Sequence, residues 1–144
     1  MSKSYYQTKI VNKDGLKGKV YVVNGISVPI DSPFAKKSDH ANPEQFLGMA
    51  LATCLNSTVQ YILKRDKMDL KSVVEVTVDL HIDESTKTYY FNVLATLGIE
   101  SLSLDETMQV LKEAETRCPV AKMLDKNYMS LNVVKYEELN DWVS

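Results

Sequence analysis

Apolar residues concentrate in one central stretch of the chain, between positions 42 and 62. Asn42 and Pro43 suit the cap and the first turn of a helix. The ten residues from Phe46 to Leu55 are apolar except for one glycine and one threonine. Because a helix that is apolar all round is normally buried on every side, the pattern predicts a long buried helix that ends near Arg65.

The N-terminal third alternates between short apolar runs and turn residues. Runs at residues 5–11, 17–23 and 26–30 predict three strands, and Asn24-Gly25 is a strong signal for a tight hairpin. These strands would form a small antiparallel meander. Residues 31–41 then form a long polar loop, of the kind that often serves as a lid or a binding loop.

Strict alternation returns after the central helix. Apolar residues occupy every second position between residues 73 and 83, and a similar run follows at residues 89–99. The two strands form a hairpin with one apolar face. We expect the central helix to cover that face.

The last third predicts two helices and one strand. A capping box, Ser-Leu-Asp-Glu, begins at residue 103 and introduces a helix that continues to residue 116. A short helix follows at residues 119–124, then a strand at residues 128–136 and a tail from residue 137. The order of elements predicts an α+β fold with a mostly antiparallel sheet, formed by a single domain over residues 1–144.

Composition excludes several classes of function. The net charge is −2 and no basic stripe is present, so we expect no nucleic-acid partner. The polar N-terminus has no apolar segment of signal-peptide length, and the central apolar run is shorter than the ~20 residues that cross a bilayer. We therefore expect no membrane partner and a cytoplasmic location, where thiols are kept reduced.

The chain has two cysteines, Cys54 and Cys118. They could be two small buried apolar residues. They could also form a disulfide, which would close a loop of some 64 residues and be worth roughly 4 kcal/mol by the entropy model. A zinc site is weakly supported, because the histidines are His40 and His81 and no Cys-x-x-Cys spacing occurs.

Local sequence alone favours Cys118 as the more reactive thiol. It follows Arg117 and precedes a predicted helix start, and both features stabilise a thiolate. Cys54 lies three turns inside its own helix, where the helix dipole has little effect. Cys54 would therefore need a cation brought from elsewhere in the fold.

Two motifs resemble a known family. Asn-Pro-Glu-Gln-Phe-Leu at residues 42–47 leads to Cys54, and Cys-Pro-Val-Ala-Lys at residues 118–122 follows after 64 residues, as in the OsmC/Ohr proteins of osmotic and organic hydroperoxide resistance. The resemblance covers most of the chain. It implies antiparallel sheets packed around a long buried central helix, in an intertwined homodimer with two active sites at the subunit interface.

The resemblance also implies a chemistry, that of a thiol peroxidase acting on organic hydroperoxides. Cys54 would attack the peroxide and become a sulfenic acid, and Cys118 would resolve it as a disulfide. An external dithiol would reduce that disulfide, and Glu44 would be the acidic partner in the site. Neither a cofactor nor a metal is implied.

One departure from the family pattern bears on activity. Active members carry an arginine in a Gly-Arg-x-Gly-like stretch, but here residues 15–18 place Leu16 at that position. The two arginines of the chain, Arg65 and Arg117, do not match it, and a lysine at position 17, 36 or 37 would lack the planar fork of a guanidinium. The alternatives are a non-catalytic protein that binds a small ligand or senses redox state, and a scaffold with inert cysteines.

Overall fold

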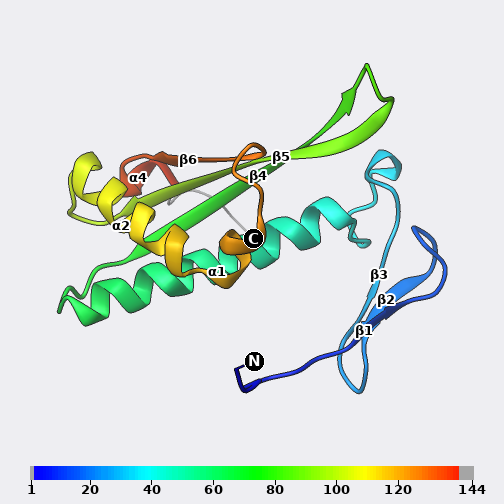
Figure 1. Ribbon diagram of the computed structural model, residues 1–144, viewed down its shortest axis with the longest axis horizontal. Helices are drawn as coiled ribbons and strands as arrows, with labels where there is room; N and C mark the ends of the chain where they lie inside the picture. Colours follow the sequence, from blue (N-terminus) through cyan, green and yellow to red (C-terminus); the bar gives the residue numbers. More distant parts are fainter. Residues whose placement is uncertain (1, 140–144) are drawn as a thin grey trace. The chain divides into compact units, whose positions relative to one another are not determined.

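The computed structural model describes residues 2–139, which divide into two compact units between Phe46 and Leu47. The first unit contains a three-stranded antiparallel sheet in the order β1-β2-β3 (Figure 1). Its strands are Ile10–Asn12, Lys19–Val22 and Ser27–Pro29. The predicted meander is confirmed. Each strand is shorter than predicted, and a turn follows β1, in which Asn12 Oδ1 accepts a hydrogen bond from the Gly15 N–H at 2.9 Å.

The loop at residues 31–41 is closed at its base. The Asp31 N–H donates to the Ala41 carbonyl at 3.0 Å, and the Ala41 N–H donates to the Pro29 carbonyl at 2.9 Å. Within the loop lies a 3₁₀ turn, η1 (Pro33–Ala35), which Ser32 caps by accepting from the Phe34 N–H at 3.2 Å. Backbone hydrogen bonds therefore hold the two ends of the loop side by side.

Helix α1 (Pro43–Arg65) is the predicted central helix. Its cap is reciprocal: the Gln45 N–H donates to Asn42 Oδ1 at 2.9 Å, and the Asn42 N–H donates to Gln45 Oε1 at 3.2 Å. Burial follows one side of the helix, at Leu51, Leu55, Val59, Ile62 and Leu63. Met49 and Tyr61 on other sides are 53% and 56% exposed, so the prediction of burial on every side is wrong for the single chain.

The central apolar run was expected to be too short to cross a bilayer, but α1 is longer than that run. The apolar run continues into a helix of 23 residues, which by length and composition alone could cross a bilayer. Here the buried side of α1 packs into the core. Core helices of soluble proteins can have the same length and apolar composition.

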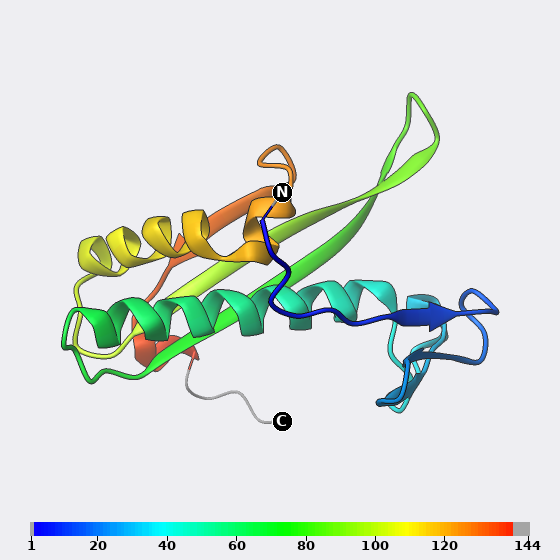
Figure 2. The same cartoon turned by 60° about the horizontal axis from the view of Figure 1, so that its bottom comes forward.

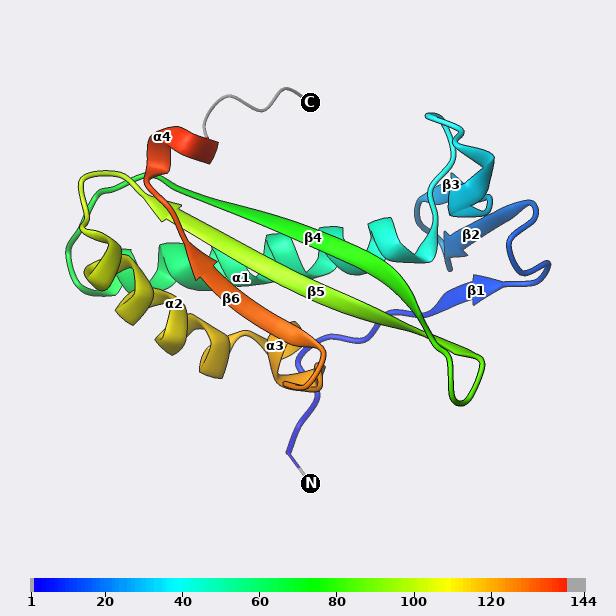
Figure 3. The same cartoon turned by 90° about the horizontal axis from the view of Figure 1, so that it is seen from above.

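The second unit has a three-stranded sheet covered on one face by helices. Strands β4 (Ser72–Asp83) and β5 (Thr88–Ile99) form the predicted long antiparallel hairpin. Strand β6 (Met129–Val133) adds to β5 in parallel, because α2 (Leu104–Arg117) and α3 (Pro119–Met123) form a crossover between them. Figures 2 and 3 show α1 and α2 on the same face of this sheet.

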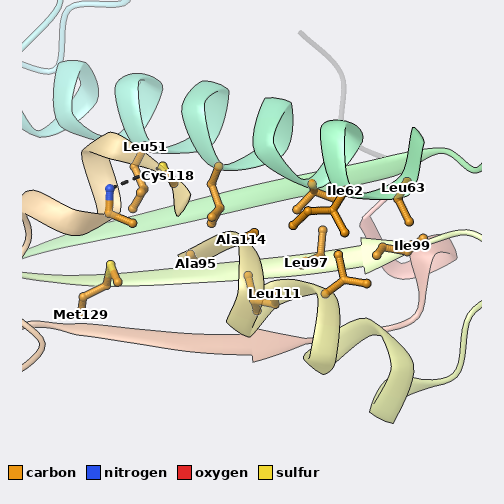
Figure 4. Close-up of a cluster of buried hydrophobic side chains, with 14 of the residues drawn as sticks. Leu51, Ile62, Leu63, Ala95, Leu97, Ile99, Leu111, Ala114, Cys118 and Met129 are labelled. Carbon is orange, nitrogen blue, oxygen red and sulfur yellow. Dashed lines mark hydrogen bonds between the residues drawn. The ribbon is translucent and has the colours of Figure 1, made fainter. Parts of the chain in front are cut away.

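The core lies between this sheet and the two long helices. Alternate residues of β5 point into it, and they are Val93, Ala95, Leu97 and Ile99. Leu51 enters from α1, and Leu111 and Ala114 enter from α2 (Figure 4). Cys118 belongs to the same cluster and has no exposed surface. The core therefore encloses one of the two candidate functional thiols.

The C-terminal prediction of a tail from residue 137 needs correction. A short helix, α4 (Tyr136–Leu139), begins there, and Leu139 is buried. Its backbone packs directly on Gly98 of β5: a Cβ atom at that position would lie 2.9 Å from the Tyr136 Cα. Since Gly98 and the core-facing Leu97 alternate in the strand, α4 starts on the face opposite to α1 and α2.

Candidate active site

The fold brings the two cysteines together although 64 residues separate them. The Cys118 thiol donates a hydrogen bond to Cys54 Sγ, with 3.0 Å between the two sulfurs. Cys54 lies on α1 and Cys118 lies between α2 and α3, so packing of α2 beside α1 creates the pair. Both cysteines are free thiols.

The backbone around Cys118 fixes its position. Its N–H donates to the Ala114 carbonyl at 2.8 Å and closes α2, and the extended conformation of Cys118 lets Pro119 start a new helix. Its sulfur accepts a hydrogen bond from the Ala121 N–H at 3.4 Å, the dashed line in Figure 4. The predicted break at Cys118-Pro119 is thus the junction between α2 and α3 that directs the Cys118 side chain toward α1.

Burial raises the pKa of the Cys118 thiol, and the hydrogen bond to Cys54 raises that pKa further. The N–H of Ala121 opposes both effects by stabilising the anion. Local sequence suggested a stabilised thiolate at Cys118, whereas the folded environment raises the pKa of this thiol. Desolvation by the core and the contact with Cys54 outweigh the backbone N–H groups at the start of α3.

Cys54 is the more accessible sulfur of the pair and is half-buried, whereas Cys118 is fully buried. The carbonyl of Cys54 accepts from Ser57 Oγ and Thr58 Oγ1, each at 2.9 Å. Within residues 2–139, its sulfur takes part in the hydrogen bond with Cys118 and in none with a lysine or an arginine. Over the same residues, no three His, Cys, Asp or Glu side chains gather as a metal site.

Both arginines of the chain are engaged by one carboxylate, that of Glu113 on α2. Arg65 reaches it from the end of α1 through Nη1 at 2.5 Å and Nη2 at 3.0 Å, and Arg117 Nε donates to it at 2.8 Å. Arg65 also donates to Asp66. These ion pairs hold the end of α1 to the last turn of α2, and neither guanidinium is directed to Cys54.

The two arginines lower the pKa of Glu113 to about 2, chiefly through the hydrogen bond from Arg65. The same contacts raise the pKa of Arg65 above its ordinary value. Sequence analysis did not identify Glu113. Its spacing of four residues from Arg117 is a recognisable helical pair, but the contact with Arg65 spans 48 residues and required the tertiary structure.

Glu44 lies in the first turn of α1, ten residues before Cys54. Ten helical residues rise ~15 Å, so the helix itself does not bring this carboxylate to the sulfur of its own chain. Among the lysines considered as substitutes for the family arginine, Lys37 is paired with Asp31 at 2.8 Å. Lys17 and Lys36 are exposed side chains of the first unit.

The fold and the pair of thiols can be compared with known proteins. One thiol lies on α1 and the other at the junction of α2 and α3. The family model for OsmC-like proteins matches residues 36–133, which include both cysteines and Glu44. The chain belongs to the OsmC-like protein family. This confirms the resemblance that the two motifs indicated.

Relatives of this OsmC-like chain match over nearly their whole length. An organic hydroperoxide resistance protein-like sequence from Staphylococcus aureus strain MSSA476 is 31% identical over 136 residues, which are 90% of this chain and 97% of the relative. The crystal structure of a redox protein from Lactobacillus casei is 30% identical, with a TM-score of 0.83, and the match covers 92% and 93% of the two chains.

A more distant structure supports the fold alone. The organic hydroperoxide resistance protein OhrB of Bacillus subtilis has a TM-score of 0.81 at 21% identity, over 91% of this chain and 100% of its own. The α+β fold predicted from the sequence is therefore confirmed as that of the OsmC-like family.

Proposed function

We propose that this OsmC-like protein is a thiol-dependent peroxidase that reduces organic hydroperoxides, with Cys54 as the peroxidatic cysteine and Cys118 as the resolving cysteine. The 3.0 Å separation of the two sulfurs, with Cys118 as the hydrogen-bond donor, carries this proposal. A protonated buried thiol beside a more accessible one suits this division of roles. The Staphylococcus aureus relative described as organic hydroperoxide resistance protein-like supports the choice of substrate.

The proposed reaction balances in two steps. The Cys54 thiolate attacks a peroxide oxygen, so an S–O bond forms, the O–O bond breaks and an alcohol leaves after protonation. Cys118 then attacks the sulfenic sulfur, which forms the disulfide and releases water. An external dithiol reduces the disulfide and returns both thiols.

Glu44 is proposed as the acidic partner in the site. Because its own helix holds it ~15 Å from Cys54, this role requires Glu44 of a second copy to approach the sulfur. The proposed assembly is accordingly an intertwined homodimer with two shared sites. A cation that joins this carboxylate to the thiolate would come from a lysine, since Glu113 engages Arg65 and Arg117.

Apolar surface left open in the single chain supports the homodimer. The first unit has an open hollow of about 730 Å³ lined mostly by apolar side chains, among them Ile10, Leu16, Val22, Ile26 and Phe46. Met49 and Tyr61 of α1 are further exposed apolar side chains. Apolar patches of this kind on a soluble chain mark interaction surfaces.

Light scattering across a range of protein concentrations tests the dimer. Ile26→Glu puts a charge into the hollow and should shift dimers to monomers, while Ser27→Glu, on the neighbouring residue outside the hollow, should not. A monomeric wild type, or equal behaviour of the two variants, contradicts the homodimer.

The remaining proposals concern organisation and location. We propose that residues 1–144 form one domain, since the family match crosses the boundary between the two units at residue 46. A cytoplasmic location is proposed on chemical grounds, because a reducing compartment keeps both cysteines available as thiols.

Peroxide consumption tests the activity. Wild type and Cys54→Ser are compared with cumene hydroperoxide as substrate and dithiothreitol as reductant. We expect turnover by wild type and none above background by the variant, and equally slow consumption by both removes the peroxidase proposal. Mass spectrometry after mild peroxide treatment then identifies the alternatives: an unmodified pair fits a ligand-binding protein, and two thiols that resist alkylation fit an inert scaffold.

A further inference from the structure

The two sulfurs of the candidate site differ sharply in access. Cys118 has 0% of its surface exposed, and it is enclosed by the core that α1, α2 and β5 form. Cys54, the other member of the pair, is half-buried. A reagent that arrives from solvent therefore meets Cys54 first.

Reduction of a disulfide requires a choice between its two sulfurs. An incoming thiolate attacks one sulfur and expels the other, and both access and leaving-group stability decide which. We propose that the external dithiol attacks Cys54 and expels Cys118, so that the mixed disulfide of the reductive half-reaction forms on Cys54. This inference rests on the proposed function only in taking the Cys54–Cys118 disulfide as the species to be reduced.

The surroundings of Cys118 act on its role as leaving group in two opposite ways, because burial disfavours charge on its sulfur and one backbone donor stabilises that charge. Its sulfur accepts a hydrogen bond from the Ala121 N–H at 3.4 Å, and such a donor stabilises the charge that develops as the S–S bond breaks. Cys54 Sγ, within the described residues, has no backbone donor of this kind. Access therefore sets the direction of attack, and the Ala121 N–H partly offsets the cost of charge on the buried sulfur of Cys118.

The electron and proton balance is as follows. One sulfur of the dithiol forms a bond to Cys54 Sγ, the disulfide bond breaks, and its electron pair passes to Cys118 Sγ, which takes up a proton. The second thiol of the reductant then attacks the reductant sulfur that is bonded to Cys54 Sγ in the mixed disulfide. This step expels the Cys54 thiolate and closes a cyclic disulfide, so the dithiol loses two electrons and the protein gains two.

The experiment does not depend on peroxide. The disulfide is formed with diamide, and the oxidised protein is treated briefly with 2-mercaptoethanol, a monothiol that stops at the mixed disulfide. Excess N-ethylmaleimide then blocks the released thiol. Trypsin separates the two cysteines, because cleavage after Lys37, Lys64, Arg117 and Lys122 leaves them on the peptides 38–64 and 118–122.

We expect the mercaptoethanol adduct on peptide 38–64 and N-ethylmaleimide on peptide 118–122, in at least about tenfold excess over the reverse arrangement. The matched control is the same oxidised protein unfolded in urea. Both sulfurs are then accessible, so the preference should fall to within about twofold.

Three results would overturn the inference: an adduct mainly on Cys118, equal adducts in the native protein, or the same ratio in native and unfolded protein. Failure of diamide to form the intramolecular disulfide would overturn it as well. A protein that shows the expected preference but does not consume peroxide would keep this inference and remove the proposed peroxidase function.

Discussion

The sulfurs of Cys54 and Cys118 lie 3.0 Å apart on elements that meet only in the folded chain. A disulfide bond is about 2.05 Å long, so oxidation requires an approach of only ~1 Å. In the proposed reaction, a second thiol held at this distance makes disulfide formation a step within one site, which raises the effective concentration of that thiol.

Replacement of Cys118 by serine should trap the oxidised form of Cys54. Without the resolving thiol, the sulfenic acid has no partner at 3.0 Å and should persist. Dimedone labelling followed by mass spectrometry measures it, and we expect strong labelling of Cys118→Ser and little of wild type. Cys54→Ser is the control and should not be labelled. Equal labelling of wild type and Cys118→Ser would contradict the resolving role.

Complementation between two inactive subunits tests whether Glu44 acts across a dimer. Cys54→Ser retains Glu44, and Glu44→Gln retains Cys54, so a mixed dimer would contain one intact site if the carboxylate comes from the partner. Random reassembly of equal amounts makes half of the dimers mixed, and peroxidase activity should recover to about a quarter of the wild-type value. Activity that stays at the level of the two separate variants would show that Glu44 does not act in this way.

Glu113 should make stability depend on acid pH. Its pKa is about 2 in the folded protein against an ordinary value of 4.5, so its ionised form is favoured by folding. That contribution is complete above pH 4.5 and is lost as the pH falls towards 2. The difference in urea midpoint between wild type and Glu113→Gln should therefore be constant above pH 4.5 and shrink below it. Glu137→Gln, at an exposed position of α4, is the control, and a difference that does not change with pH would contradict the ion-pair account.

Two glycine-to-alanine substitutions should have opposite effects on stability. At Gly98 the new Cβ would lie 2.9 Å from the Tyr136 Cα and 3.3 Å from its nitrogen, so α4 must shift, at a cost of about 1–3 kcal/mol. At Gly48, inside α1, the Cβ would meet Val78 at an ordinary 3.5 Å, and the gain in helix propensity is about 0.5–1 kcal/mol. Urea unfolding measures both, and destabilisation by Gly48→Ala or stabilisation by Gly98→Ala would contradict the packing described.

Truncation of Leu51 should show how much the core under the thiol pair contributes. This side chain is fully buried in the cluster that also contains Cys118, and Leu51→Ala should lower the free energy of unfolding by about 2–5 kcal/mol. Thr53→Ala, an exposed position on the same helix, is the control and should change it by less than about 0.5 kcal/mol. Similar losses in the two variants would mean that the core does not depend on Leu51.

Much of the fold was predictable from local pattern. The cap at Asn42, the hairpin of β4 and β5, and the break at Cys118-Pro119 are each set by neighbouring residues, so their positions followed from the sequence. Helix α4 was not predicted, because it is held by the contact of its backbone with Gly98, which is distant in sequence. The parallel pairing of β6 with β5 likewise depends on how the crossover packs.

The sequence by itself determined the elements, the family motifs and the identity of the two candidate thiols, because capping, alternation and motif spacing are properties of consecutive residues. Only the tertiary structure decided which thiol is buried, that the sulfurs meet, and that Glu113 engages both arginines. Those outcomes depend on desolvation and on contacts between residues 48 or 64 positions apart. Local features favoured a thiolate at Cys118, and burial in the core opposes that thiolate because its desolvation outweighs the stabilisation from the helix start.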